Sequence, residues 1–363
     1  MKRRLIAGVA IFATCGMVLA ACSSSGGGSA SQSSSAPGTS SSQGSSSSAE
    51  QPPASTESSG SSESSSTSVP DLGHATILTN WFAESSQGGY WAAQAEGLAA
   101  ARGVDLEVKQ GGPGIQTIPQ VVAGQADFGV GNADEIMVAI SNGLPIVAVA
   151  TGEAQNIQCL AYHKSTGIKS FADLNGKTVS RVPSPYWDFI KWKYKLDKVN
   201  EINIGSLANF QKDPNLVLQC FITQEPYEID KMGMKDVGYL EVGKDAGYKS
   251  DLTMLFTTKK LAQEKPDLVR AVVQASNEGW AKMLADPTKT KALIMKVNPD
   301  GDPGAFDYSI KLFKERPELL GAPNYGIMSP ERFKELKQQL VDIGLLKPDF
   351  DETKAYDLSF GQK

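Results

Sequence analysis

The side chains best suited to catalysis and metal binding are scarce in this chain. It has 363 residues but only two histidines, His74 and His163, and four cysteines. No CxxC pair and no spacing typical of a metal site occurs among them. His163 stands between Tyr162 and Lys164, at what we interpret as a polar strand end, so we do not expect it to act as a base. We therefore predict no catalytic residue, no metal ion and no cofactor.

The chain begins with a segment whose last residue could carry a lipid. Three basic residues precede an apolar run from Leu5 to Leu19, and small residues stand directly before Cys22. This pattern is typical of a secretory signal peptide, and its ending resembles the lipobox of bacterial lipoproteins. The alternative, a transmembrane anchor, needs about 20 apolar residues. We predict a signal peptide at 1–21, a lipid on Cys22 and an extracytoplasmic protein held to the cell membrane by that lipid only.

A serine-rich segment follows Cys22. Serine makes up just over half of residues 23–68, and no large apolar residue occurs there. Such a segment cannot bury enough surface to offset its conformational entropy. We predict that 22–73 is a disordered linker, with a glycosylated stalk as the alternative. The formal net charge of the chain is −5, which argues against nucleic-acid binding.

The rest of the chain predicts alternating strands and helices. The expected strands are 75–81, 104–109, 127–131, 145–150, 159–163, 178–182, 202–205, 218–223, 237–242 and 252–257. The expected helices are 89–102, 115–123, 133–142, 171–174, 185–196, one opening at 226, 266–285, 287–297, 303–316 and 330–343. This alternation predicts βαβ units and a largely parallel sheet.

The segment after the predicted linker, 74–363, has about 290 residues, which are too many for one compact core. We therefore expect lobe one to begin with 74–155 and lobe two to comprise 156–251. A mostly helical return, 252–363, should pack on lobe one.

An ordered set of segments resembles a class of substrate-binding proteins of ABC importers, the SsuA/THI5-like family, whose members bind nitrate, sulfonates, taurine, thiamine pyrimidines and riboflavin. The matching segments are 80–84, 88–93, 111–114, 123–135, 167–179, 223–227, 269–271 and 279–280. The segments 185–189 and 209–210 resemble the pyrimidine-precursor and riboflavin-binding members most. The resemblance implies an α/β, periplasmic-binding-protein type II fold, in which two α/β lobes surround a hinged ligand cleft.

In open α/β sheets, ligands bind outside the carboxyl ends of the strands. Applied to the expected strands, this rule selects aromatic side chains that could stack on a flat ligand and polar side chains that could hydrogen-bond to it. The predicted ligand-binding residues are Asn80, Trp81, Phe82, Tyr90, Asn132, Asp134, Tyr186, Trp187 and Glu225. For most of them a structural role is the alternative, either in the core or in the first turn of a helix.

The resemblance implies a receptor that captures a small planar heteroaromatic ligand and delivers it to an ABC permease and its ATPase. We expect a monomer. A binder of nitrate, sulfonate or taurine-like anions stays open, although Arg181 is the only arginine expected at a strand end. An extracellular sensor also stays open, and an enzyme of the pyrimidine-synthase type would need a cysteine-rich motif. Cys159 and Cys220 could form a disulfide in an oxidising exterior or remain buried thiols.

Overall fold

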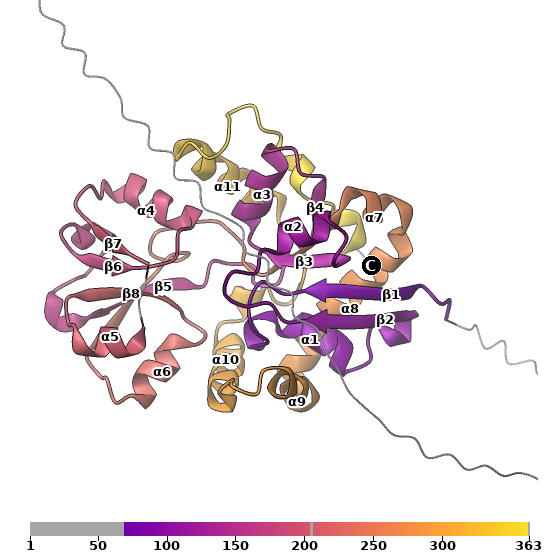
Figure 1. Cartoon of the computed structure of the whole chain (residues 1–363), viewed down its shortest axis with the longest axis horizontal. Coiled ribbons are helices and arrows are strands. Elements are labelled where there is room, and N and C mark those ends of the chain that lie inside the picture. Colours follow the sequence, from indigo (N-terminus) through magenta and orange to yellow (C-terminus); the bar gives the residue numbers. More distant parts are fainter. Residues whose placement is uncertain (1–68, 204–205, 362–363) are drawn as a thin grey trace, which may run out of the picture. The chain divides into compact units, whose positions relative to one another are not determined.

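Two five-stranded sheets organise the part of the chain that the structure describes, residues 69–203 and 206–361. The structure is a computed structural model (Figure 1). The predicted signal peptide, Cys22 and nearly all of the predicted linker lie outside the described residues. None of the described helices combines the length and the apolar character that crossing a membrane requires.

The first sheet has the strand order β2-β1-β3-β10-β4. Its strands are β1 (Gly73–Leu78), β2 (Val104–Lys109), β3 (Phe128–Gly131), β4 (Ile146–Ala150) and β10 (Met254–Thr258). The edge strand β2 alternates buried apolar and exposed charged residues, whereas all five residues of β4 are buried. The alternation of β2 follows from the pleat, which turns successive side chains to opposite faces of a sheet. Strand β4 lies at the other edge and is buried throughout because α3, α8, η6 and η7 pack against it.

The second sheet has the order β7-β6-β8-β5-β9. Its strands are β5 (Gln158–His163), β6 (Thr178–Ser180), β7 (Asn200–Ile202), β8 (Leu216–Phe221) and β9 (Val237–Glu241). The two sheets correspond to the two predicted lobes, and we call the parts of the structure built on the first and second sheet lobe one and lobe two.

Both sheets are largely parallel, as predicted, and each contains one antiparallel strand. β10 runs antiparallel to β3 and β4, and β5 runs antiparallel to β8 and β9. Both strands come directly after the chain has passed from one sheet to the other. A strand that enters a sheet directly from the connection begins at the edge where the connection arrives, so it runs away from that edge. The other strands of the sheet run toward that edge.

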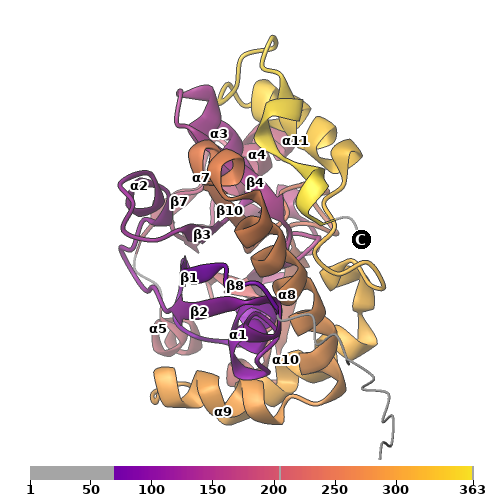
Figure 2. The ribbon, with the colours of Figure 1, turned by 90° about the vertical axis from the view of Figure 1, so that its right-hand side faces the viewer.

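Helices flank both sheets (Figures 1 and 2). They are α1 (Gly88–Ala95), α2 (Thr117–Val122), α3 (Ala133–Ser141), α4 (Pro185–Tyr194), α5 (Leu207–Lys212), α6 (Glu225–Lys231), α7 (Lys259–Glu264), α8 (Pro266–Ala285), α9 (Thr288–Val297), α10 (Pro303–Glu315) and α11 (Pro330–Asp342). Short 3₁₀ helices are η1 (Ser85–Gln87), η2 (Ala100–Arg102), η3 (Lys164–Thr166), η4 (Phe171–Leu174), η5 (Pro317–Leu320), η6 (Glu352–Ala355) and η7 (Leu358–Phe360).

Several expected elements have other bounds in the structure, two strands among them. The strand expected at 202–205 is β7, which ends at Ile202 because its register with β6 begins at Asn200 opposite Thr178. The strand expected at 75–81 ends at Leu78. Trp81 therefore lies in a loop beyond the strand, and this shift decides its exposure.

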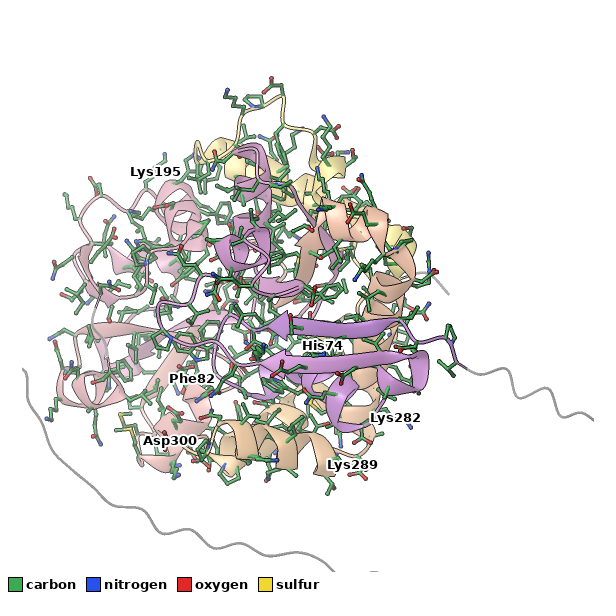
Figure 3. All side chains as sticks on the ribbon, turned by 45° about the vertical axis from the view of Figure 1, so that its right-hand side comes forward. His74, Phe82, Lys195, Lys282, Lys289 and Asp300 are labelled. Carbon is green, nitrogen blue, oxygen red and sulfur yellow. A yellow bond between two sulfur atoms is a disulfide. The ribbon has the colours of Figure 1, made fainter. Side chains whose placement is uncertain are left out.

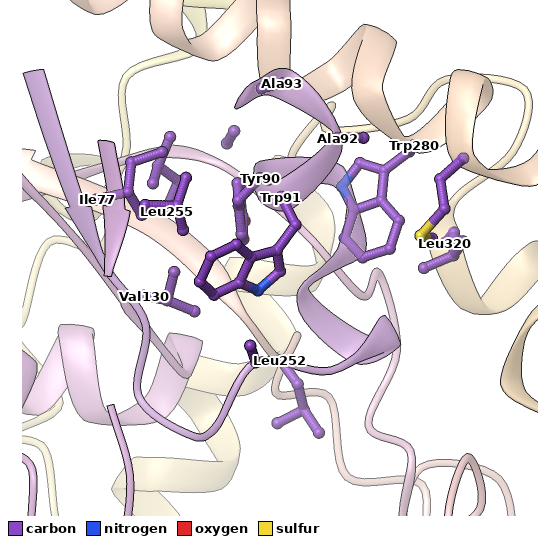
Figure 4. Packing of buried hydrophobic residues seen from close by; sticks show 14 of the residues in the cluster. Ile77, Tyr90, Trp91, Ala92, Ala93, Val130, Leu252, Leu255, Trp280 and Leu320 are labelled. Carbon is purple, nitrogen blue, oxygen red and sulfur yellow. The ribbon is translucent and has the colours of Figure 1, made fainter. Parts of the chain in front are cut away.

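The core of lobe one centres on α1 and α8, which pack closely together. Tyr90, Trp91 and Trp280 are fully buried there, and the rings of Tyr90 and Trp280 meet edge to face with centroids 6.2 Å apart (Figure 4). The helices approach closely because Gly279 has no side chain: a Cβ there would lie 2.1 Å from the carbonyl oxygen of Gly89. This packing fixes the start of α1 beside the end of β1.

Lobe two contains a disulfide between Cys159 and Cys220. The two cysteines are direct partners in the antiparallel pair of β5 and β8. The disulfide therefore joins the strand that enters lobe two to the central strand of its sheet. Of the two alternatives that the sequence left open, a disulfide and two buried thiols, the structure has the disulfide.

Candidate ligand-binding site

The loop after β1 presents the most exposed aromatic surface among the predicted site residues. Thr79 turns the chain there, because its hydroxyl donates to the carbonyl oxygen of Trp81 at 2.7 Å. Gly111 donates its N–H to the same carbonyl at 3.0 Å. Both bonds hold the loop outside the sheet, so its side chains do not continue the buried pattern of β1.

Trp81 and Phe82 form an exposed aromatic pair. Trp81 is 45% exposed and Phe82 39% exposed, and their rings meet edge to face with centroids 5.5 Å apart. Phe82 lies beyond the end of β1 (Figure 3). Asn80 precedes them, and its Oδ1 accepts a hydrogen bond from Gln87 Nε2 at 3.0 Å. This pair can provide flat apolar surface to a ligand.

Three other predicted residues of lobe one have structural partners. Tyr90 is fully buried, and its hydroxyl donates to the carbonyl oxygen of Thr253 at 2.5 Å. Asp134 is 4% exposed and accepts a hydrogen bond from the hydroxyl of Tyr248 at 2.9 Å. Asn132 is the N-cap of α3 and forms a capping box with Glu135. Burial raises the pKa of Asp134, while the hydrogen bond from Tyr248 lowers it.

Tyr186 and Trp187 lie in the core of lobe two, with exposures of 1% and 0%. The ring faces that we expected to stack on a ligand are thus covered. Arg181, at the end of β6, forms an ion pair with Glu201 and lies over the ring of Trp187, with Cζ 5.6 Å from its centroid. Its charge is therefore engaged within lobe two.

Glu225 begins α6, at the carboxyl end of β8, and its Oε2 accepts the backbone N–H of Phe221 at 2.7 Å. Burial raises the pKa of Glu225 to about 7, and the charges of Glu228 and Glu84 raise it as well. Burial raises the pKa of Glu84 to about 7, with a further contribution from Glu228. Carboxyl groups of the two lobes therefore influence each other.

A fourth carboxyl group belongs to the same network. Glu153 is 1% exposed, and its pKa is raised by burial and then by the charge of Glu84. We call Glu84, Glu153, Glu225 and Glu228 the acidic cluster. Among the described residues, none of the four forms an ion pair with a basic side chain.

The C-terminal helices hold the two sides of this cluster together. Asn298, at the end of α9, donates from Nδ2 to the carbonyl oxygen of Ala83 at 3.1 Å, next to Glu84. Ser309 of α10 donates to the carbonyl oxygen of Thr223 at 2.7 Å, just before Glu225. Both η1 and α6 pack against α10. The return segment thus positions Glu84 of lobe one near the first turn of α6 in lobe two.

A separate groove of about 490 Å³ lies between α2 and α3 of lobe one and the start of α4 in lobe two. Its lining residues are Ile118, Pro119, Glu135, Val138, Ala139, Asn142, Leu144, Pro183, Ser184, Pro185, Asp188 and Leu345. None of the nine predicted ligand-binding residues lines it. We place the candidate site at the loop after β1, because exposed aromatic rings and uncompensated carboxyl groups occur there.

The sequence analysis overlooked Glu84, Glu153, Glu228 and Gln87. Glu84 shares the loop of Trp81 and Phe82, and Glu228 stands one helical turn after Glu225, so both had a signal in the sequence. Glu153 lies in the connection between the sheets and had none, because the pairing of that connection is a tertiary feature.

Comparison with solved structures identifies the fold. The aliphatic sulphonate binding protein SsuA from Escherichia coli is 15% identical, with a TM-score of 0.62 over 80% of this chain and 93% of that chain. The desulfurization enzyme DSZB is also 15% identical, with a TM-score of 0.52 over 79% of this chain and 97% of that chain. At such identities the similarity shows the fold alone. The fold is the periplasmic-binding-protein fold, as the sequence predicted.

Sequence comparison then identifies the family. A family model described as NMT1/THI5 like matches residues 85–290, which is more than half of the chain, and the chain belongs to this family. The riboflavin-binding protein RibY of Chloroflexus aurantiacus is 22% identical over 308 residues, which cover 80% of this chain and 87% of RibY. The family resemblance predicted from the ordered segments is confirmed.

Proposed function

We propose that this protein is the extracytoplasmic substrate-binding component of an ABC importer, and that it captures a small planar heteroaromatic ligand and delivers it to a permease. The observation that carries the proposal is the exposed Trp81–Phe82 pair, which stands between Asn80 and Glu84 in the loop after β1. Aromatic rings with a few polar groups suit such ligands. The membership in the NMT1/THI5-like family and the similarity to a protein named for riboflavin support the same ligand class.

The alternative ligand class, sulfonate-like or nitrate anions, is supported by the fold shared with SsuA. An anion would need basic groups at the site. Arg181 is engaged by Glu201, and the loop after β1 carries the buried carboxyl group of Glu84, which is influenced by the charge of Glu228. Electrostatics therefore favour the heteroaromatic ligand, because like charges repel at a partly buried site.

An enzymatic function is not part of this proposal, although DSZB shares the fold. Both cysteines of the described residues are joined in one disulfide, so neither offers a thiolate nucleophile. In the proposed receptor, the two lobes act by closing around the ligand. Closure around the ligand produces a shape that the permease and ATPase can distinguish from the empty form.

A thermal-shift screen tests the proposal. The panel should contain riboflavin, a thiamine pyrimidine precursor, an alkanesulfonate, taurine and nitrate. A ligand at 100 times its Kd adds about 2.7 kcal/mol to the free energy of unfolding, so a true ligand raises the Tm clearly. We expect a heteroaromatic compound to do so. Stabilisation by nitrate, the sulfonate or taurine alone would reject this ligand class.

A further inference from the structure

Among the described residues, four carboxyl groups from both lobes form no ion pair with a basic side chain and influence one another through their charges. Glu84 influences Glu153 and Glu225 through its charge, and Glu228 influences Glu84 and Glu225. The backbone brings the two sides together, because η1, which follows Glu84, and α6, which begins at Glu225, both pack against α10. Asn298 and Ser309 anchor the backbone on both sides of the cluster, at Ala83 and Thr223. The cluster is thus a fixed feature of the fold.

Three basic side chains on or next to the neighbouring helices have other partners. Lys231 of α6 contacts Asp302 at 2.6 Å, and Lys291 of α9 contacts Asp307 at 2.6 Å. Arg316, which follows α10, pairs with Glu241 at 2.8 Å. These pairs compensate acids outside the acidic cluster. Within the described residues no basic side chain compensates the cluster, and its raised pKa values show that negative charge is unfavourable there unless protons or a cation compensate it.

Two buried acceptor atoms near the cluster have no hydrogen-bond donor among the described residues. They are Oε1 of Glu153 and Oε1 of Gln87, and each side chain is only 1% exposed. Gln87 follows Glu84 in the chain, and Glu153 senses the charge of Glu84. A buried acceptor without a donor costs free energy, so such atoms indicate a missing partner. For the amide oxygen of Gln87 the missing partner is a donor of hydrogen bonds, whereas the carboxyl group of Glu153, whose pKa is raised, can donate or accept.

The Trp81–Phe82 pair is a third feature that favours a positively charged ligand. Trp81 and Phe82 immediately precede Ala83 and Glu84 in the same loop, and both rings are partly exposed. The face of an aromatic ring attracts a cation, most strongly when water is excluded. Negative charge, acceptor atoms and exposed rings therefore select one type of ligand.

We propose that the acidic cluster and the Trp81–Phe82 pair bind an organic cation, that is, a ligand that carries a positive charge and N–H donors on or next to a planar ring. This inference rests on the proposed function and narrows its ligand class. The charge would lie between Glu84 and the first turn of α6, and the ring against Trp81.

Three probes of nearly equal size and different charge test the inference. They are 1-methylnicotinamide, which carries a fixed positive charge, the neutral nicotinamide and the negative nicotinate. Affinity should be measured by calorimetry on the full chain at low salt and pH 7.5. We expect the cation to bind at least ten times more tightly than the neutral amide, and nicotinate to bind most weakly.

Matched variants locate the effect. Glu84→Gln and Glu228→Gln each remove one charge and keep the side-chain shape, and both should reduce the preference for the cation several-fold. Glu107→Gln serves as the control, because Glu107 is an exposed acid of β2 that contacts Lys109. It should leave the preference unchanged. Two separate variants of the cluster are used so that a folding defect in one does not decide the result.

The inference is overturned if the neutral or negative probe binds as tightly as the cation, if no probe binds, or if both cluster variants keep the full preference. The proposed function fails separately: it falls if no heteroaromatic compound of the thermal-shift panel stabilises the protein. Binding of riboflavin without any preference for the cation would therefore reject the inference and leave the receptor function standing.

Discussion

Glu153 and Leu252 pair through their backbones in both directions. The N–H of Glu153 donates to the carbonyl oxygen of Leu252 at 3.0 Å, and the N–H of Leu252 donates back at 2.9 Å. Each residue belongs to one of the two connections between the sheets. The pair therefore joins both connections at a single point, so that any motion of one lobe relative to the other must bend the two connections together.

The first prediction concerns this junction. Gly152 precedes Glu153, and a Cβ at Gly152 would lie 2.3 Å from Oγ1 and 2.6 Å from the carbonyl oxygen of Thr253. Gly152→Ala should lower the free energy of unfolding by about 1–3 kcal/mol, because overpacking forces the backbone to shift. Urea denaturation measures this. Gly97→Ala is the control: it meets no atom within 4 Å and tests only the strain of a left-handed residue, about 1 kcal/mol. Equal effects of both substitutions would contradict the predicted clash.

The second prediction concerns ligand stacking. Trp81→Ala should weaken binding of the cognate ligand by about tenfold or more, because it removes a ring that contributes roughly 0.5–1.5 kcal/mol beyond its buried area. Calorimetry measures the change. Trp192→Ala is a suitable control, since Trp192 is also exposed and also contacts a phenylalanine ring, that of Phe189, but lies on α4. A larger effect of Trp192→Ala would mean that the site is misplaced.

The third prediction is a pH dependence of stability. The pKa of Glu84 and of Glu225 is about 7 in the folded protein, above the ordinary value of 4.5. Between these values the unfolded chain has released the protons that the folded chain still binds. The free energy of unfolding of the empty protein should therefore fall as the pH rises from about 4.5 to 7, and change little above.

Denaturation curves of Glu84→Gln and Glu225→Gln at several pH values test this dependence. Both variants should lose less stability than the unsubstituted protein between pH 5 and 7, because an amide does not titrate. The Glu107→Gln protein provides the reference. Identical pH profiles for all four proteins would show that these carboxyl groups titrate at their ordinary pKa.

The fourth prediction concerns the disulfide. Cys159 and Cys220 are separated by 61 residues, and a disulfide that closes a loop of this size typically adds about 2–4 kcal/mol to stability. Reduction should lower the urea midpoint accordingly. The double variant Cys159→Ser, Cys220→Ser should have a low midpoint that does not respond to reductant. If reduction leaves the midpoint of the unsubstituted protein unchanged, the disulfide does not contribute as expected.

The fifth prediction concerns the membrane anchor. Cys22→Ala should release the protein from the membrane fraction or block processing of its signal peptide, because the proposed lipid would have no attachment point. Cys15→Ala, within the predicted signal peptide, should leave both unchanged. Mass spectrometry of the mature protein should find the lipid on Cys22. A membrane-bound Cys22→Ala protein that still carries the lipid would exclude this anchor.

Much of the fold could be predicted from local signals. β2 was predicted at its observed bounds, because Val104, Leu106 and Val108 alternate with charged residues. α8 was also predicted at its observed bounds, since Pro266 is favourable at the first position of a helix. The ordered segments identified the family. These features depend on periodicity and on neighbouring residues, which a sequence displays directly.

The tertiary structure alone decided which candidate side chains reach solvent. Trp81 and Trp187 both stand near strand ends in the sequence, yet one is 45% exposed and the other is fully buried. The hydrogen bond from Thr79 turns Trp81 out of the sheet, whereas the core of lobe two covers Trp187. The acidic cluster also required the fold, because Glu84, Glu153 and Glu225 come from distant segments. Burial and mutual repulsion depend on distances between such segments, and no local pattern encodes them.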